Sequence, residues 1–368
     1  MNILFDHQTF SLQTFGGISR YYAELITGIN CTLENHAYLP LVFTENVHLR
    51  EKGLKAKYLL PKKNFYKKAQ FTYRSNQVYT VAQMHGKSFD VFHATYYDSY
   101  FIPHLRGRPF TVTFLDMIHE KFSNQFATLS DSNFVTKQKQ LIADRADRII
   151  AISESTKRDV VELLSIDPAK IDVIYLGNSL EPVAGDENDQ QSHYPYLLFV
   201  GRRERYKNFE GMLHAIHPVL KKHKIKLVCA GGGPFSNNEK ELIHKLNVDD
   251  LVVYRIIEND IALQKIYRQA IAFIFPTMYE GFGIPVLEAF ASDCPCIVSN
   301  LSSLPEVAGD AALYIDPAQP DSMPEAIEQL LHDNGLRQKL IKAGQQQLSH
   351  FSWQRTVDET LSLYKRLA

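Results

Sequence analysis

The chain has 368 residues, of which 45% are hydrophobic and 22% charged, a composition typical of a globular protein with about two domains. The formal net charge of −1 gives no overall electrostatic reason to expect nucleic-acid binding. The four cysteines show neither disulfide-like nor CxxC spacing, which favours a reducing compartment. Neither a signal peptide nor an apolar run of membrane-spanning length is visible, so we expect a cytoplasmic protein.

Short apolar runs rich in β-forming residues alternate with helical patterns in the first half of the chain. Helices are expected at residues 16–29 and 153–165, the second with Ser153 as its N-cap. Strands are expected at residues 2–5, 39–43, 90–94, 110–115, 148–153 and 171–176.

A polar, acidic segment at residues 177–195 contains Gly and Pro and reads as a linker. The alternation then resumes, with helices expected at 207–223 and 258–270 and no strands from about residue 321 onward. Strands are expected at residues 196–201, 225–231, 251–256, 272–276, 296–300 and 312–317.

Near-continuous apolar strands that alternate with helices predict parallel sheets covered on both faces. We therefore expect an α/β protein of two doubly wound, Rossmann-like domains, residues 1–180 and 181–351, facing each other across a cleft. The last helix, at about 352–368, is expected to pack back on the first domain. Ligands of such sheets bind beyond the carboxyl ends of the strands, which places the expected site in the cleft.

The stretch "YEGFGIPVLEAF" carries two carboxylates, Glu280 and Glu288, around a Gly-Phe-Gly turn. Pro285 suits the first turn of a helix, so Glu288 is expected in that turn. Both acids would then point toward the same opening at the carboxyl end of the preceding strand. Gly281 and Gly283 would let the backbone turn sharply and approach a ligand, while the first helix amides suit a phosphate or a sugar. Alternatively, Glu288 only complements the helix dipole and Glu280 is solvated; the residues leave both interpretations open.

Basic residues follow the first strand of the second half, in "FVGRRERYKNFEGML". Arg202, Arg203, Arg205 and Lys207 stand at a strand end before a helix, where they would neutralise a diphosphate leaving group. The alternative for each of them is a solvated basic loop.

Three features of the first half also fall at strand ends. Gly16 and Gly17 precede a helix, so their amides face either a ligand or only a tight turn. Asp116 and His119 follow a buried strand, and His93 ends another, where a structural hydrogen bond is the commoner role for histidine.

Residues 50–74 hold nine Lys or Arg and one Glu, a local charge of +8, with five interleaved aromatic residues. This mixture favours peripheral contact with an anionic membrane surface at the inner leaflet. Single-stranded nucleic acid and a plain solvated helix are the alternatives.

Three motifs in register resemble the family 4 glycosyltransferases of the GT-B fold: "FGGISRYYAEL", "GRRERYKNFEGML" and "YEGFGIPVLEAFASDCPCIVSNLSSLPEVAGDAALYIDP". The resemblance covers nearly the whole chain. It implies a retaining transferase that uses a nucleotide sugar and needs no metal or other cofactor, and no D-x-D motif is present. In this family a basic segment such as 50–74 often lies near a lipid-linked acceptor.

The resemblance also implies roles for individual residues of the second half. Glu288 would bind the donor ribose, and Arg202 with Lys207 would stabilise the departing diphosphate. The donor sugar would be held by Glu280 together with the turn and its amides: Gly281, Phe282, Gly283 and Ile284.

In the first half, Gly16 and Gly17 match the family's glycine loop. Many members have a His-Asp pair where this chain has Leu115 and Asp116. The resemblance implies an acceptor-side or sugar-side catalytic role for Asp116 and for His119, which stands three residues later in place of the usual histidine.

We therefore expect a hexosyltransferase that acts on a glycan or lipid-linked glycan acceptor in surface-polysaccharide or O-antigen assembly. The donor suggested by the resemblance is GDP-mannose, and UDP-sugars stay open. The alternatives are a nucleotide-sugar epimerase or an NAD-dependent dehydrogenase on a related fold, or a non-catalytic sugar-binding protein. "AGGGPFSNNE" lacks the third glycine of a dinucleotide fingerprint at the right spacing, which disfavours the dehydrogenase.

Overall fold

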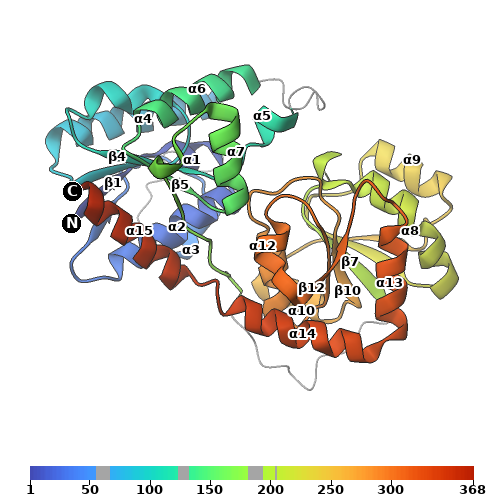
Figure 1. The fold of residues 1–368 in the computed structure, drawn as a ribbon. Helices are drawn as coiled ribbons and strands as arrows, with labels where there is room; N and C mark the ends of the chain where they lie inside the picture. Colours follow the sequence, from blue (N-terminus) through green and yellow to red (C-terminus); the bar gives the residue numbers. More distant parts are fainter. Residues whose placement is uncertain (55–66, 123–131, 181–193, 204) are drawn as a thin grey trace. The chain divides into compact units, whose positions relative to one another are not determined.

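The computed structural model describes residues 1–54, 67–122, 132–180, 194–203 and 205–368 (Figure 1). They form two compact units: Met1–Gly177 joined by Trp353–Ala368, and Asn178–Ser352. Each unit has a six-stranded parallel sheet with helices on both faces. The α/β class is therefore confirmed. The expected linker lies largely outside the described residues, as do residues 55–66 of the basic segment 50–74.

The first sheet has the strand order β2-β1-β3-β4-β5-β6. Register pairs such as Ile3 with Val91 and Phe92 with Phe110 align the strand ends along one edge. The strands are β1 (Asn2–Phe5), β2 (His36–Tyr38), β3 (Val91–Ala94), β4 (Phe110–Phe114), β5 (Arg148–Ala151) and β6 (Ile171–Val173).

The helices of this unit include α7 (Glu154–Leu164), where Ser153 caps as expected by accepting the Thr156 N–H at 2.9 Å. The other α-helices are α1 (Gln8–Leu12), α2 (Gly17–Asn30), α3 (Val47–Glu51), α4 (Lys68–Gly86), α5 (Ile118–Phe122), α6 (Ser132–Arg145) and α15 (Trp353–Leu367). The 3₁₀ turns among the described residues of this unit are η1 (Ser99–His104) and η3 (Pro168–Lys170).

The second sheet has the order β12-β11-β10-β7-β8-β9. Its strands are β7 (Tyr196–Val200), β8 (Lys226–Ala230), β9 (Val252–Arg255), β10 (Ala272–Phe275), β11 (Cys296–Ser299) and β12 (Ala312–Ile315). Its α-helices are α8 (Phe209–His223), α9 (Asn237–Lys245), α10 (Asp260–Arg268), α11 (Ile284–Ala291), α12 (Leu304–Ala308), α13 (Ser322–His332) and α14 (Asn334–Leu348). The 3₁₀ turns are η4 (Arg205–Lys207) and η5 (Gly309–Ala311).

The prediction of a strand at residues 39–43 is wrong. The strand β2 ends at Tyr38, and residues 39–43 are irregular. Pro40 has no N–H for a ladder, and the Asn76 side chain of α4 takes over the hydrogen bonding. Its Oδ1 accepts the N–H groups of Val42 and Phe43 at 3.0 and 2.9 Å. A side chain from a distant helix thus replaces the neighbouring strand.

The C-terminal helix α15 belongs to the first unit and packs on α2 (Figure 1). Tyr364 lies fully buried there and shares a 2.5 Å hydrogen bond with Nδ1 of His93 in β3. Trp353 approaches the ring of Tyr21 at 6.2 Å. The two ends of the chain therefore contribute to one core. Among the described residues, no helix combines the length and the apolarity that crossing a membrane requires.

Candidate functional site

The order of strands marks one crevice in the second unit. From β7 the chain moves outward to β8 and β9, and it then returns to place β10 on the other side of β7. The loops that leave the carboxyl ends of β7 and β10 therefore diverge, which makes this point the topological switch of the sheet. Lys207 follows β7 and Glu280 follows β10, so both come to this crevice.

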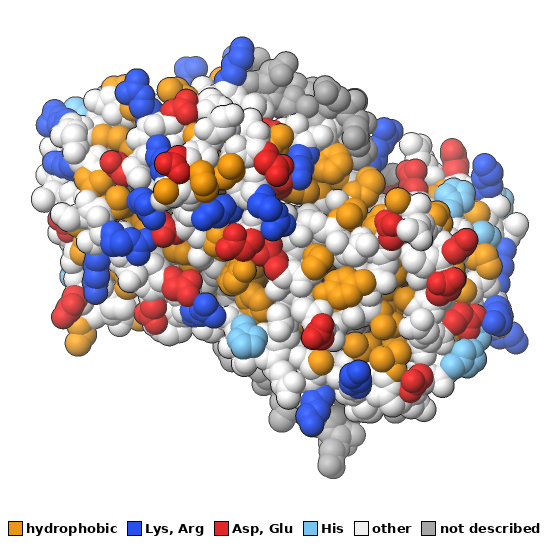
Figure 2. All heavy atoms as spheres, viewed as in Figure 1, with side chains coloured by type: hydrophobic (Ala, Val, Ile, Leu, Met, Phe, Trp, Pro, Cys, Tyr) orange, Lys and Arg blue, Asp and Glu red, His pale blue; other side chains and the backbone are white. Residues whose placement is uncertain are grey.

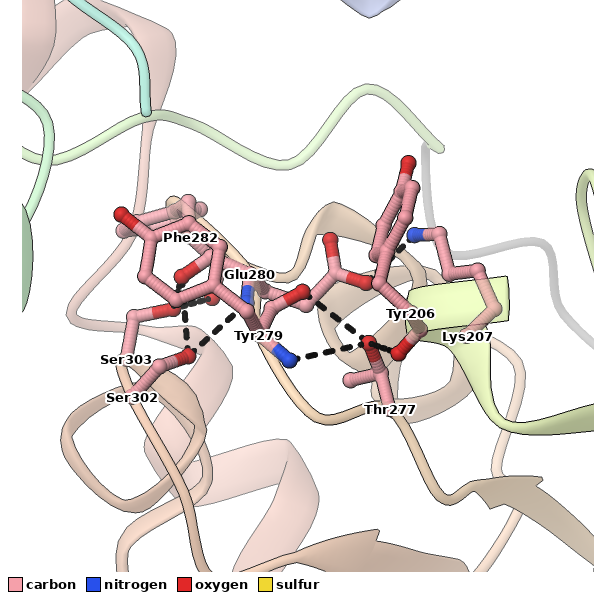
Figure 3. A network of polar contacts seen from close by, with 8 residues as sticks. All are labelled: Tyr206, Lys207, Thr277, Tyr279, Glu280, Phe282, Ser302 and Ser303. Atoms are coloured by element: carbon pink, nitrogen blue, oxygen red, sulfur yellow. Dashed lines mark hydrogen bonds and ion pairs between the residues drawn. The ribbon is translucent and has the colours of Figure 1, made fainter. Parts of the chain in front are cut away.

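Hydrogen bonds join these two loops directly (Figure 3). The carbonyl of Tyr206 accepts the Met278 N–H at 2.7 Å and the Thr277 hydroxyl at 3.1 Å. Thr277 also donates to the carbonyl of Tyr279 at 3.0 Å. The loop that carries Lys207 is thus held on the loop that carries Glu280.

Lys207 and Glu280 form an ion pair between Nζ and Oε1 (Figure 3). Their side chains are only 15% and 14% exposed, so the pair is partly withdrawn from water. Ser302 accepts the Glu280 N–H at 2.8 Å and donates to the Glu280 carbonyl, to which Ser303 also donates. The backbone at Glu280 is therefore pinned by the loop after β11, a role the sequence analysis did not assign to either serine.

The turn after Glu280 requires glycine at one position. Gly283 has φ 109°, and a Cβ there would lie 2.7 Å from Cδ2 of Leu304. It caps α11 without a side chain. Pro285 has no N–H and the Val286 N–H donates to the Gly283 carbonyl at 2.9 Å, so the Ile284 N–H is the helix amide that remains for a ligand. Phe282 is buried, with its ring 5.7 Å from that of Phe351, and Ser303 donates to its carbonyl at 2.8 Å. The expected turn of Gly281 to Ile284 is thus a rigid helix start.

The expectation that Glu288 lies in the first turn of its helix is wrong. α11 begins at Ile284, and Glu288 is its fifth residue. Its side chain is buried, with 7% exposed, and Oε2 accepts the Tyr267 hydroxyl of α10 at 3.1 Å. Burial, reinforced by this carboxylate, raises the pKa of Tyr267 well above its usual range. A role as a simple complement to the helix dipole is excluded by this position, because the dipole acts within the first turn.

The two arginines that follow Gly201 differ in their surroundings. Arg203 donates to Oε1 of Glu239 at 2.6 Å and to the carbonyls of Gly231 and Gly233 at 3.3 and 2.8 Å. Its guanidinium also lies 4.8 Å from the Phe235 ring. Arg203 is therefore a structural residue.

Arg202 is exposed, whereas its neighbour is fixed inside the fold. Arg205 is exposed as well, at the start of the 3₁₀ turn that ends with Lys207. The basic loop thus has Arg202 and Arg205 exposed at the carboxyl edge of the sheet, whereas Lys207 is paired with Glu280.

The glycines of "AGGGPFSNNE" have a packing role that the sequence analysis missed. Gly231, Gly232 and Gly233 all have positive φ, and a Cβ on Gly232 would lie 2.3 Å from the carbonyl oxygen of Gly201. Only glycine lets the loop after β8 lie directly against the loop after β7. The run of three glycines was the signal for this close approach.

The first unit has a cavity at its own switch point, between the carboxyl ends of β1 and β3. Its volume is about 500 Å³, within the usual range for small-molecule pockets. The walls come from α1, the loop after β3, α4 and α6 and are largely aromatic and aliphatic. The lining residues are Gln8, Ser11, Leu12, Ala69, Gln70, Tyr73, Arg74, Tyr96, Tyr97, Asp98, Phe134, Val135 and Gln138.

The cavity wall also carries two planar polar side chains, those of Gln70 and Arg74. No described residue hydrogen-bonds to the side chains of Gln70 or Arg74. Asp98 accepts the Tyr73 hydroxyl at 2.9 Å and holds the cavity wall together. Phe134 is 66% exposed at the rim. Aromatic faces with planar polar groups around them are suited to a sugar ring.

Asp6 and His7, which the sequence analysis did not select, lie fully buried directly before Gln8, which lines this cavity. Nδ1 of His7 is 2.9 Å from the Ser11 hydroxyl, and Nε2 has no hydrogen-bond partner among the described residues. Burial raises the pKa of Asp6 to about 6 and lowers the pKa of His7 to about 3. Their place directly after a buried strand was the only sequence signal.

Gly16 and Gly17 begin α2, which follows β1 and α1. Gly16 is its N-cap, and its carbonyl accepts the Arg20 N–H and the Ser19 hydroxyl, each at 3.0 Å. Gly17 is exposed, and a Cβ there would meet nothing within 4 Å. Neither glycine lines the cavity of the first unit.

Asp116, His119 and His93 are not brought together into that cavity either. Oδ1 of Asp116 accepts the Ile118 N–H at 3.2 Å at the start of α5, on which His119 lies half-buried. His93 is fully buried between Tyr364 and Thr113, with ring nitrogens 2.5 and 2.9 Å from their hydroxyls. Burial lowers the pKa of His93 to about 3, as expected of a structural histidine.

Comparison with known families covers both halves of the chain. Residues 15–181 match the model described as "Glycosyltransferase Family 4", and residues 185–347 match "Glycosyl transferases group 1". O-antigen chain mannosyltransferase B of Escherichia coli is 28% identical over 235 residues, which are 61% of this chain and 62% of that protein. The match spans less than two thirds of the length of the first curated relatives.

Solved structures with the same fold extend over the whole chain. Sucrose-phosphate synthase of Thermosynechococcus elongatus has a TM-score of 0.79 at 19% identity, over 100% of this chain and 98% of that one. HepE of Anabaena, solved in complex with UDP and glucose, has a TM-score of 0.74 at 13% identity, over 99% of each chain. At these identities the likeness concerns the fold alone.

Proposed function

Because this chain belongs to the family 4 glycosyltransferases of the GT-B fold, we propose that it transfers a hexose from a nucleotide sugar to a glycan or lipid-linked glycan. One observation carries the proposal. The Lys207–Glu280 pair stands at the switch point of the second sheet, between the exposed basic loop and the amino-terminal end of α11. A cation, a carboxylate and the first amide of α11 at one place match the diphosphate and the hydroxyls of such a donor.

Each element of this crevice has a task in the proposed reaction. The bond between the anomeric carbon and the diphosphate oxygen breaks as the acceptor hydroxyl attacks that carbon. Lys207 and the exposed Arg202 stabilise the negative charge that develops on the leaving diphosphate. Glu280 and the amides at Gly283 and Ile284 hold the donor sugar. Glu288 accepts from the ribose hydroxyls, a task that requires it to exchange its hydrogen bond with Tyr267 for one with the ligand. The reaction retains the anomeric configuration and needs no metal at this site.

The best candidate for the donor is GDP-mannose, and the setting is surface-polysaccharide or O-antigen assembly. The mannosyltransferase name of the E. coli relative supports both. UDP-sugars are the second candidate, favoured by the UDP and glucose in the Anabaena structure. The cavity of the first unit takes a sugar of the acceptor, stacked on its aromatic wall and hydrogen-bonded by Gln70 and Arg74.

The acceptor assignment has a test of its own. Phe134 is exposed at the cavity rim and supports no core, so Phe134→Ala leaves the fold intact. We expect a rise of about tenfold in the acceptor KM from the loss of one stacking face, with donor affinity unchanged. Equal acceptor KM values in variant and wild type would place the acceptor elsewhere.

Calorimetric titration of the purified chain with GDP, UDP, dTDP and NAD, with and without Mg²⁺, tests the proposed donor. We expect tight binding of one nucleoside diphosphate, independent of the metal, and weaker binding of the same nucleotide in Glu288→Ala. Binding of NAD alone would support the dehydrogenase instead, and no binding of any of the four would reject the donor site. Flotation with anionic vesicles tests the membrane contact proposed for residues 50–74.

A further inference from the structure

A second group of charged side chains lies at the other end of the second unit. His223 is the last residue of α8, and Glu328 and His332 stand one turn apart on α13, which packs against α8. Nε2 of His223 is 3.0 Å from both carboxylate oxygens of Glu328, and Nε2 of His332 is 3.1 Å from Oε2. Figure 2 shows histidine, basic and acidic side chains together along the side of this unit where α13 lies.

We propose that His223, Glu328 and His332 bind a divalent transition-metal ion, with Zn²⁺ as the preferred metal. Two imidazole nitrogens and one carboxylate oxygen form a ligand set that suits Zn²⁺, with a water in the fourth position. Their ligand atoms all lie within 4.8 Å of one another. A tetrahedral Zn²⁺ at about 2.0–2.2 Å from each ligand holds neighbouring ligands about 3.4 Å apart, which small side-chain rotations reach.

Lys222 is the competitor for this carboxylate, since its Nζ lies 2.7 Å from Oε1 of Glu328. The Lys222 side chain is 64% exposed, so releasing it to water costs little. Metal binding requires neutral imidazoles and therefore weakens as the pH falls.

The position of the cluster separates it from the transfer chemistry. α8 begins two residues after Lys207 and has 15 residues, so His223 lies about 22 Å along the helix from the proposed donor site. His332 likewise ends α13, at the amino-terminal edge of the sheet. The metal would tie α8 to α13 and stabilise the second unit without taking part in catalysis, so the metal-independent reaction proposed above is unaffected.

Titration of the chelator-treated full chain with ZnCl₂, followed by calorimetry and thermal unfolding, tests the site. We expect one Zn²⁺ per chain and, at about 100-fold excess over Kd, a rise in Tm of about 5 °C or more. His223→Ala, Glu328→Gln and His332→Ala should each weaken binding at least about tenfold, since each removes one of three ligands.

Two control variants make the result specific. His244 is a comparable surface histidine beside a carboxylate, 3.3 Å from Asp249 on the same unit, and Cys31 is an exposed thiol elsewhere. His244→Ala and Cys31→Ser should bind Zn²⁺ as the wild type does. The proposal is overturned by an absence of stoichiometric Zn²⁺ binding, or by binding that survives all three ligand substitutions. Nucleotide affinity should be equal in all these variants, so the outcome is independent of the proposed function.

Discussion

Replacement of Lys207 by methionine gives the sharpest test of the proposed chemistry. Nζ of Lys207 lies 5.0 Å from the centre of the Phe275 ring. Methionine keeps most of the apolar volume of the lysine side chain, so the packing beside this ring is largely retained while the charge is lost. Lys207 is 15% exposed, which reduces solvent screening of its charge. At about 4 Å and an effective dielectric constant of about 20, one charge on the diphosphate would gain about 4 kcal/mol from the lysine.

Part of that interaction is offset, because Lys207 already pairs with Glu280. Loss of a single preorganised charge-stabilising donor commonly costs about 10²–10³ in turnover, or about 2.7–4 kcal/mol. We therefore expect Lys207→Met to lower kcat about 100-fold or more, and to change donor KM much less. Lys207→Arg should recover part of the loss, since it restores the charge with different geometry.

The assay is the initial rate of nucleoside-diphosphate release over a range of donor concentrations, using the donor that calorimetry identifies. Lys240→Met is the matched control, because Lys240 is an exposed lysine on α9 of the same unit. The double variant with Glu280→Gln measures the coupling between the two partners, which should be non-additive by about 0.5–3 kcal/mol. A Lys207→Met enzyme with kcat within threefold of the wild type would refute leaving-group stabilisation by this residue.

Three further predictions address other parts of the molecule. Glu288→Ala should weaken nucleotide binding at least about tenfold in calorimetry by removing a carboxylate acceptor; an unchanged Kd would contradict the ribose assignment. Gly283→Ala should destabilise the second unit by about 1–3 kcal/mol in urea unfolding, since φ 109° and the 2.7 Å contact with Leu304 both exclude a Cβ. Wild-type stability in that variant would show that the turn relaxes freely. Burial lowers the pKa of His93 from 6.5 to about 3. Below about pH 6.5 the unfolded chain therefore binds a proton at this residue that the folded chain does not, and the free energy of unfolding decreases as the pH is lowered. Between about pH 8 and about pH 5.5 this histidine should account for about 1.4 kcal/mol of the loss, and His93→Gln should remove that portion; an equal pH dependence in both proteins would refute it.

Much of the fold follows from local patterns that need no tertiary information. Strands such as Tyr196–Val200 and Phe110–Phe114 are buried along their whole length, and a short run of apolar, β-forming residues predicts that directly. Ser153 caps its helix by a hydrogen bond to a residue three positions away, so the local sequence suffices. Local patterns gave a wrong prediction at residues 39–43. The backbone N–H groups there donate to the side chain of Asn76, which is more than thirty positions away in the sequence.

The candidate site divides in the same way. Gly283 and Pro285 predict a helix start after the turn, and the motif identifies Glu280, Glu288 and Lys207 as a set. Sequence alone does not distinguish Arg202 from Arg203, because their surroundings depend on where the loop after β8 lies. The same holds for Ser302 and Ser303, which pin Glu280 only because β11 pairs beside β10.

The class of fold, the family and the residues that carry its motifs could therefore be predicted from the amino-acid sequence, since all of these depend on periodicity and on short-range spacing. Tertiary structure alone decided which of those side chains meet: the pairing of Lys207 with Glu280, the burial of Glu288 against Tyr267, and the cavity between α1, α4 and α6. The tertiary structure also brings together His223 and Glu328, which are more than a hundred residues apart in the sequence. The physical reason is that parallel strands bring distant loops to one edge of a sheet, and the partners met there are set by strand order.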